Sequence, residues 1–452
     1  AVCRVAEPIA ITSILPYAWS MIKDFHITTD QNASFYAGIL VGAYAFSEAI
    51  TSVFWGALSD RIGRRPVVLL GCCGTIVSLM LVGLAPTFWV ALVGRILGGA
   101  LNGNIAVIQT MVCELIEDAE NEPQAYAVMP FFWSLGTIIG PAIGGLLAKP
   151  AEGFPSMFSP TGLFGRFPYL LPNLVCSILL CLSIFCVWLF LRETHPDMQP
   201  QDTKWHDPAQ QPLLSHHTDS DPTNNPLSND PPKPRPSSPN TTTTTIYTPS
   251  LTMFILALAI FTFHSMSYDH LLPIFLQDSS PSSSPTLSKN PLSIPSGLGL
   301  TTQTTGLILA SDSIIALLIQ SMLFPVLARI YGVWNLYIFV TSLHPACYLI
   351  HPFLAFLPRY LLFPGIYICL IIRNVLSIIA YPVLLILIKQ ATVDPKALGR
   401  VNGLAACAGA VSRMVAPPVA GALYAVGKGV GCTGLAWWGT AGAAGVGAVQ
   451  VW

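Results

Sequence analysis

Charged residues are scarce in this chain, and their scarcity limits what kind of protein it can be. Of its 452 residues only 10% are Asp, Glu, Lys or Arg, whereas 53% are hydrophobic. A soluble domain carries about 25% charged residues. The sequence therefore indicates a protein solvated mainly by lipid. Its formal net charge of −1 gives no sign of binding to nucleic acid.

Paired cysteine motifs are also missing. The 11 cysteines are scattered, and most of them lie inside apolar runs. Because no Cys-x-x-Cys pair and no Cys/His spacing typical of zinc occurs, packed thiols explain them best. We expect no resident metal and no bound cofactor. The chain has no initiator methionine either, and Ala1 and Trp452 both fall within apolar segments. We expect both cytoplasmic tails, with any targeting signal, to lie outside this sequence.

Long hydrophobic runs, by contrast, are abundant. A helix that spans a bilayer needs about 20 apolar residues. Windows of that kind fall near 1–22, 35–58, 67–86, 88–110, 125–148 and 168–191. They resume near 250–276, 301–327, 334–352, 360–388, 401–425 and 430–452. The predicted fold class is an all-α membrane protein with 12 transmembrane helices.

A polar segment separates the two sets of windows. It is rich in Pro, Ser, Thr, Asn and Asp, a composition that cannot bury a core and predicts disorder. We therefore expect an N-terminal six-helix bundle over 1–191, a disordered cytoplasmic linker over 192–249, and a C-terminal six-helix bundle over 250–452.

Basic residues give the orientation, because Lys and Arg gather in cytoplasmic loops. If the loop after the second window is inside, the inner loops hold Arg61, Arg64, Arg65, Arg192, Lys204, Lys233, Arg235, Arg329, Lys389, Lys396 and Arg400. The outer loops then hold only Lys23, Lys149, Arg166, Lys289, Arg359 and Lys428. This excess supports the assignment.

The two halves carry matching positions in the same order. Leu58 and Gly63 match Leu327 and Gly332, Arg95 matches Arg373, and Leu15-Pro16 matches Leu272-Pro273. Gly140-Pro141 with Gly145 also matches Ala416-Pro417 with Gly421. These matches predict two pseudo-symmetric bundles. Membrane proteins built this way bind substrate at the interface between the repeats, near the bilayer midplane.

One charged loop stands between two apolar windows: Gly56-Ala57-Leu58-Ser59-Asp60-Arg61-Ile62-Gly63-Arg64-Arg65. It resembles the signature loop of the major facilitator superfamily between the second and third helices. The resemblance implies a cytoplasmic latch between the halves, built from Gly56, Asp60, Arg61, Gly63, Arg64 and Arg65. We expect Arg64 or Arg65 to reach Glu114. The second-half copy, residues 327–334, has lost the aspartate and the trailing arginines, so the latch should depend on the first half.

Two further motifs agree with this family. Gly94-Arg95-Ile96-Leu97-Gly98-Gly99 resembles its fourth-helix arginine motif. The run from Gly136 to Gly145 resembles the fifth-helix motif of proton-coupled antiporters and drug exporters, with Gly136, Gly140, Pro141, Gly144 and Gly145 as its key residues. Cys3 to Ile9 and His264 to Asp269 are similar to the zinc-induced-facilitator-like group and its fungal relatives.

Charges inside the apolar windows are the candidate coupling residues. They are Arg4, Glu7, Glu48, Arg95, Asp269, Asp312, Arg373 and Arg413. Each costs roughly 2.5 to 3.5 kcal/mol at a helix centre, so such residues usually face the bundle interior and mark a function. Glu7, Asp312 and Glu48 are the candidate proton carriers, and the alternative for Glu7 is a permanent ion pair with Arg4 or Arg413. His264 occupies the place that corresponds to Glu7 in the second half.

The resulting interpretation is a secondary transporter that works by alternating access, not an enzyme. We expect proton-coupled antiport of a small organic compound by a monomer in the plasma or vacuolar membrane. Two alternatives stay open. One is a proton-coupled or facilitative transporter for an inorganic cation such as zinc or potassium. The other is a membrane receptor that keeps the fold without transporting.

Overall fold

The computed structural model describes residues 2–27, 29–104, 107–108, 111, 122–191, 193, 248–278, 294, 297–392 and 398–451. The predicted linker, 192–249, lies almost entirely outside these residues. The first half contains α1 (Val2–Thr12), α2 (Ala18–Asp24), α3 (Ala33–Ile62), α4 (Arg64–Gly83), α5 (Phe88–Leu101), α7 (Glu122–Leu147), α8 (Pro150–Gly153), α9 (Leu163–Arg166) and α10 (Leu170–Phe190).

The second half contains α11 (Pro249–Gln277), α12 (Thr302–Leu318), the π-turn η3 (Ile319–Leu323), α13 (Phe324–Tyr331), α14 (Val333–Ile350), the 3₁₀ turn η4 (His351–Phe356), α15 (Arg359–Ala391), α16 (Leu398–Val430) and α17 (Gly434–Val451). Where the structure describes them, the apolar windows of the sequence coincide with helices, and the window 301–327 contains α12, η3 and part of α13. Eight segments of the described chain are long and apolar enough to cross a bilayer, and α5 and part of α7 are shorter apolar helices.

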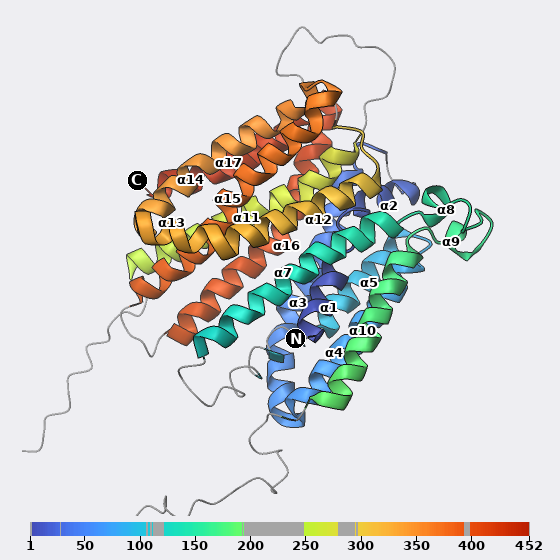
Figure 1. Ribbon diagram of the computed structural model, residues 1–452, viewed down its shortest axis with the longest axis horizontal. Helices are drawn as coiled ribbons and strands as arrows, with labels where there is room; N and C mark the ends of the chain where they lie inside the picture. Colours follow the sequence, from blue (N-terminus) through green and yellow to red (C-terminus); the bar gives the residue numbers. More distant parts are fainter. Residues whose placement is uncertain are drawn as a thin grey trace, which may run out of the picture.

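The helices form two sets that meet along two crossings (Figure 1). Within the first set α3 packs on α5, α4 on α10, and α1 on α7. Within the second set α11 packs on α16 and α17, and α14 packs on α15 and α17. Contacts between the sets are made chiefly by α3 with α16 and by α7 with α12. In the same view, α13 lies apart from the turn that joins α3 to α4.

The two crossings repeat one geometry. A Cβ atom built on Gly38 of α3 would lie 2.3 Å from the carbonyl oxygen of Pro417 on α16. At the other crossing, a Cβ atom built on Gly306 of α12 would lie 2.7 Å from the carbonyl oxygen of Pro141 on α7. Gly306 follows Gly38 by 268 residues, and Pro417 follows Pro141 by 276. The pseudo-symmetry read from the sequence is therefore a symmetry of the interface.

The π-turn explains a small irregularity in this repeat. Gly63 and Gly332 are 269 residues apart, one more than Gly38 and Gly306. Both end a helix with positive φ, 97° and 75°, and both precede the next helix directly. The π-turn η3, Ile319–Leu323, lies between Gly306 and Gly332. A π-turn takes one residue more than an α-helical turn, which accounts for the change of offset.

The first predicted span is interrupted. Residues 13–17 form a turn between α1 and α2, in which Leu15 and Tyr17 donate to carbonyls three residues back. Pro16 has no N–H with which to continue an α-helix. The window near 1–22 is therefore two helices separated by a turn, not one continuous helix.

Candidate functional site

The charged loop of the first half forms a tight turn from α3 into α4. Gly63 adopts φ 97°, a conformation that glycine takes without strain. Across the turn, the Arg64 guanidinium lies 2.5 Å from Asp60 Oδ1 and donates to Ser59 Oγ at 2.6 Å. Arg64 is buried, whereas Asp60 and Arg61 are exposed and Gly56 has open space beside it. The motif thus folds back on itself around one buried arginine.

Glu193 anchors this turn, and the sequence analysis missed it. Its two carboxylate oxygens accept hydrogen bonds from the backbone N–H groups of Arg64 at 2.8 Å and Arg65 at 3.0 Å. A negative charge at a helix N-terminus is favourable, and these N–H groups begin α4. Arg65 also donates to the carbonyl oxygen of Trp188 on α10. Glu114, the expected partner, lies outside the described residues.

The signal for Glu193 was present in the sequence. It is a carboxylate directly after a long apolar run, on the same expected side as the loop. Among the residues that the structure describes, the loop contacts Trp188 and Glu193 at the end of α10, within its own half. The latch between halves therefore stays a prediction.

An ion pair lies inside the second bundle. Arg373 on α15 donates to Asp269 Oδ1 on α11 at 2.5 Å and to Ser265 Oγ at 3.0 Å. Its guanidinium carbon is 4.5 Å from the centre of the Tyr268 ring, in the range of a cation–π contact. Arg373 is 6% exposed, whereas the Asp269 side chain is 36% exposed, so the pair is buried on the arginine side only.

Asp312 belongs to the same network. Asn374 Nδ2 donates to Asp312 Oδ1 at 2.8 Å and to the Asp312 carbonyl oxygen at 3.0 Å. Asn374 in turn accepts from Arg373 at 3.3 Å. The structure thus brings together three sequence candidates, Asp269, Asp312 and Arg373, from α11, α12 and α15. Since α12 also forms the crossing with α7, the network adjoins the interface between the halves.

Arg95, the first-half counterpart of Arg373, has different partners. It donates to the carbonyl oxygen of Leu40 at 3.3 Å and lies 4.6 Å from the centre of the Tyr44 ring. The Tyr44 hydroxyl accepts a hydrogen bond from Asn102 at 2.6 Å. Arg95 is buried and makes no ion pair with a described carboxylate. The two arginines occupy matching places in the two halves, but only Arg373 pairs with a described carboxylate.

A second group of charges lies near the crossing of α3 and α16. Glu48 is half-buried on α3, and the charged groups of Glu7, Arg413 and Arg95 lie in its neighbourhood. Glu7 is buried on α1, and Arg413 is exposed on α16. The side chain of Arg4 lies outside the described residues. This group joins acids of the first half to an arginine of the second.

His264 is embedded among aromatic rings. Its Nδ1 is 3.0 Å from the Tyr348 hydroxyl, and its ring centre is 5.0 Å from that of His344. His344 Nε2 is 3.2 Å from Ser377 Oγ. His264 is therefore part of a hydrogen-bonded aromatic core within the second bundle, although the sequence had matched it to Glu7.

The glycines of α7 allow two close packings. Cβ atoms built on Gly136, Gly140 and Gly144 would lie within 2.4 Å of Pro8 Cγ, Thr12 Oγ1 and the Ser13 carbonyl oxygen of the α1 segment. One built on Gly145 would lie 2.5 Å from Gly306 Cα. The fifth-helix motif thus fits α7 against α1 on one side and, through Pro141 and Gly145, against α12 on the other.

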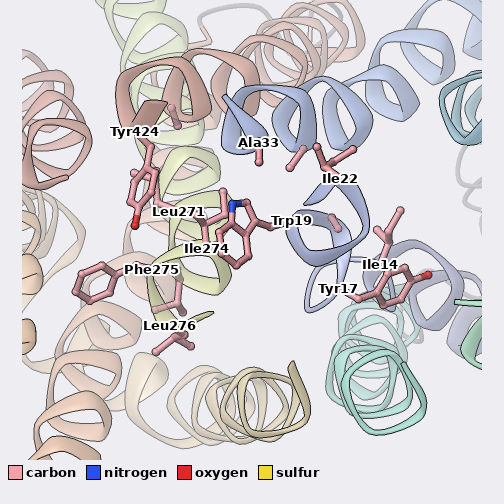
Figure 2. Close-up of a cluster of buried hydrophobic side chains, with 14 of the residues drawn as sticks. Ile14, Tyr17, Trp19, Ile22, Ala33, Leu271, Ile274, Phe275, Leu276 and Tyr424 are labelled. Carbon is pink, nitrogen blue, oxygen red and sulfur yellow. The ribbon is translucent and has the colours of Figure 1, made fainter. Parts of the chain in front are cut away.

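The two halves are joined at the end that the basic residues mark as outer. Gln277 Nε2 at the end of α11 donates to the Pro16 carbonyl oxygen at 2.6 Å. Trp19 of α2 lies beside Leu271 and Ile274 of α11 (Figure 2). The Lys428 ammonium is 5.9 Å from the Trp19 ring centre. One buried apolar cluster therefore runs across both halves at this end.

Asp278 supports this closure and was not among the sequence candidates. It is 1% exposed and accepts from Lys428 Nζ at 2.7 Å and from the Tyr424 hydroxyl at 2.9 Å. Among the residues that the structure describes, no three His, Cys, Asp or Glu side chains are grouped to hold a metal ion.

Comparison with known proteins identifies the family. The Major Facilitator Superfamily pattern matches residues 1–417. The Major facilitator superfamily multidrug transporter mfsB of Aspergillus fumigatus is 35% identical, over 97% of this chain and 79% of that protein. Protein ZINC INDUCED FACILITATOR-LIKE 1 of Arabidopsis thaliana is 29% identical, over 92% of this chain and 80% of that protein.

Solved structures agree on the fold. A D-xylose-proton symporter matches with a TM-score of 0.71 at 12% identity, over 100% of this chain and 95% of that one. The human organic anion transporter MFSD10 matches with a TM-score of 0.58 at 16% identity, over 100% and 97%. The family and the fold predicted from the loop motif are thereby confirmed. This chain is a multi-pass membrane transporter and belongs to the major facilitator superfamily.

Proposed function

We propose that this transporter is a proton-coupled antiporter that moves a small organic compound by alternating access. The name of the Aspergillus fumigatus relative, a multidrug transporter, supports an organic substrate. The fifth-helix glycines and Pro141, typical of antiporters in this family, support exchange. The proposal extends the family assignment to a coupling ion and a substrate class.

The observation that carries the proposal is the ion pair of the partly exposed Asp269 with the buried Arg373, with Asp312 hydrogen-bonded to the neighbouring Asn374. Ionisable residues inside a membrane are costly and are kept for function. If Asp269 takes up a proton, its charge and its ion pair with Arg373 are lost together. That change links proton binding to the packing of α11, α12 and α15.

The first-half acids are the second candidate for coupling. Glu48 lies in the field of Arg413 across the crossing of α3 and α16. A rocking motion of the two halves changes the separation of Glu48 and Arg413, and with it the affinity of Glu48 for a proton. The protonation of Glu7 and Glu48 would then change with the conformation of the transporter.

The contacts at the outer end support alternating access. Gln277, Trp19 and Lys428 join the halves there. For substrate to pass from one side to the other, these contacts must open while others close at the inner end, where the Gly56–Arg65 loop is the proposed latch.

One copy of the chain suffices for this mechanism, since both crossings are formed within it. We therefore propose a monomer in the plasma or vacuolar membrane.

The test uses purified protein in vesicles with a pH-sensitive dye inside and a panel of organic cations, organic anions and amino compounds outside. We expect substrate addition to release protons in the wild type. Asp269→Asn, Asp312→Asn and Glu48→Gln are tested one at a time. We expect at least one of these variants to move substrate without dependence on the pH gradient. Glu152→Gln is the matched control, because that side chain is 76% exposed.

Three outcomes would contradict the proposal. Substrate flux that is independent of the pH gradient would exclude proton coupling. Flux of zinc or potassium without any organic substrate favours the inorganic-cation alternative. Binding of a compound without flux favours a receptor.

A further inference from the structure

Three buried rings in the core of the second bundle carry polar atoms that no group in the described part of the chain satisfies. They are Tyr268 on α11, His351 at the start of η4, and Trp437 on α17, each 0% exposed. The Tyr268 hydroxyl, both His351 ring nitrogens and Trp437 Nε1 have no hydrogen-bond partner among the described residues. These polar atoms belong to neighbouring side chains from three different elements.

The rings touch one another. His351 stacks on Trp437 with ring centres 4.4 Å apart and an angle of 25° between their planes. The Tyr268 ring meets both of them edge to face, at 5.2 Å and 5.5 Å. Arg373, whose guanidinium covers Tyr268, adds a further buried nitrogen, Nε, without a partner. Unsatisfied polar atoms therefore concentrate at one place beside the ion pair.

Such a concentration is physically expensive. A buried polar group without a hydrogen bond costs about 1 to 3 kcal/mol, and most such groups in native proteins are satisfied by protein or by ordered water. Apolar residues of similar shape would avoid this cost entirely. The rings form a polar site that the described protein atoms alone do not complete.

A second, separate observation lies next to it. A small, partly open cavity of about 10 Å³ is lined by residues that include Phe261, His264, Tyr337, Thr341 and His344. That volume is close to the minimum for one water molecule, which also needs polar partners. Thr341, His264 and His344 are the polar residues that line this cavity, and both ring nitrogens of His344 already have protein partners. Because His264 bonds to Tyr348, whose ring is 5.6 Å from Tyr268, the cavity and the three rings belong to one continuous core.

We propose that this core is a binding site for ordered water. Water molecules satisfy Tyr268, His351 and Trp437 at the outer end of the site and occupy the cavity beside His264 and His344 at its other end. Water held next to the Arg373 Nε atom also fixes the guanidinium that binds Asp269. The inference concerns hydration of the core and does not require proton coupling.

Radiolytic hydroxyl-radical footprinting tests the proposal, because radicals made from bound water modify the side chains around it. The full chain in detergent or lipid nanodiscs is irradiated, and modification is read by mass spectrometry. We expect Tyr268, His351 and Trp437 to be modified several-fold faster than Tyr17 and Phe88. These two controls are equally buried rings, and the Tyr17 hydroxyl has a protein partner in Asn173. Equal rates at both sets would overturn the proposal.

Two variants sharpen the test. His351→Phe keeps a ring on Trp437 but removes both nitrogens, so modification of Trp437 should fall toward the rate of Phe88. An unchanged rate at Trp437 would count against bound water.

Tyr268→Phe gives an independent sign. If the hydroxyl binds water, its loss should lower the melting temperature. If the site is dry, deleting an unsatisfied hydroxyl leaves the melting temperature equal or higher, and the proposal fails.

Discussion

Gly145 and Gly306 meet at the crossing of α7 and α12 with no side chain between them, and a Cβ atom on Gly145 would lie 2.5 Å from Gly306 Cα. A side chain at either position must push the two helices apart. Since this crossing and the one between α3 and α16 hold the halves together, the closeness of these two glycines determines how the halves fit.

Gly306→Val is therefore expected to destabilise the closed outer end. Overpacking of this kind costs about 1 to 3 kcal/mol, which should lower the melting temperature and reduce substrate flux at least severalfold. Gly442→Val on α17 is the matched control, because a Cβ atom there has nothing within 4 Å. Equal behaviour of the two variants in a flux assay would show that the close crossing has no part in transport.

Replacing both members of the Arg373–Asp269 pair should do less harm than replacing one. Arg373→Ala leaves the Asp269 carboxylate without its cation. Loss of one partner of a fully buried pair costs about 3 to 5 kcal/mol, and because the Asp269 side chain is 36% exposed we expect a smaller cost. Arg373→Ala combined with Asp269→Asn removes both charges. Thermal unfolding in detergent should show the double variant closer to the wild type. If the two losses simply add, the ion pair is not the reason for the instability.

Glu193→Gln should weaken the turn between α3 and α4. Its carboxylate accepts two backbone N–H groups, and hydrogen bonds to charged groups contribute about 1.5 to 3 kcal/mol. Because Glu193 is only partly buried, we expect the lower end of that range. Differential scanning fluorimetry measures the shift, with Glu152→Gln as the exposed control. A melting temperature like that of the control would mean that the backbone holds this turn unaided.

Lys428→Met should loosen the outer closure, because it leaves the buried Asp278 without its cation. Cys432 lies four residues away, at the same end of α16. Its reaction with a membrane-impermeant maleimide, read by mass spectrometry, should become faster. Arg359→Met, which changes an exposed charge at the start of α15, should leave that rate unchanged. If the labelling rate is unchanged in both variants, the ion pair of Asp278 with Lys428 does not hold the outer end closed.

The helices could be predicted because hydrophobicity along a membrane span needs only local sequence. The matched pairs Gly63 with Gly332 and Pro141 with Pro417 predicted the repeat as well, and these residues occupy equivalent places in it. The family followed from the loop around Asp60. In each case the signal was a pattern of neighbouring residues.

Charge pairing could not be predicted in the same way. A helical rise gives the depth of Asp269 or Arg95, but which face points to which neighbour depends on the packing of several helices. Hence Arg373 has a carboxylate partner, whereas Arg95 lies on Tyr44. Asp278 and Glu193 were missed because they end apolar segments, where a charge usually faces solvent. Their partners come from elements far away in the sequence.

The π-turn at Ile319–Leu323 has a consequence for how the two halves correspond residue by residue. One residue rotates an α-helix by about 100°, so an insertion into a regular helix would have turned its whole inner end toward the lipid. Absorbed as a bulge, the extra residue left Gly332 in the conformation of Gly63. An alignment of the halves without a gap there would match lipid-facing positions with interior ones over half a span.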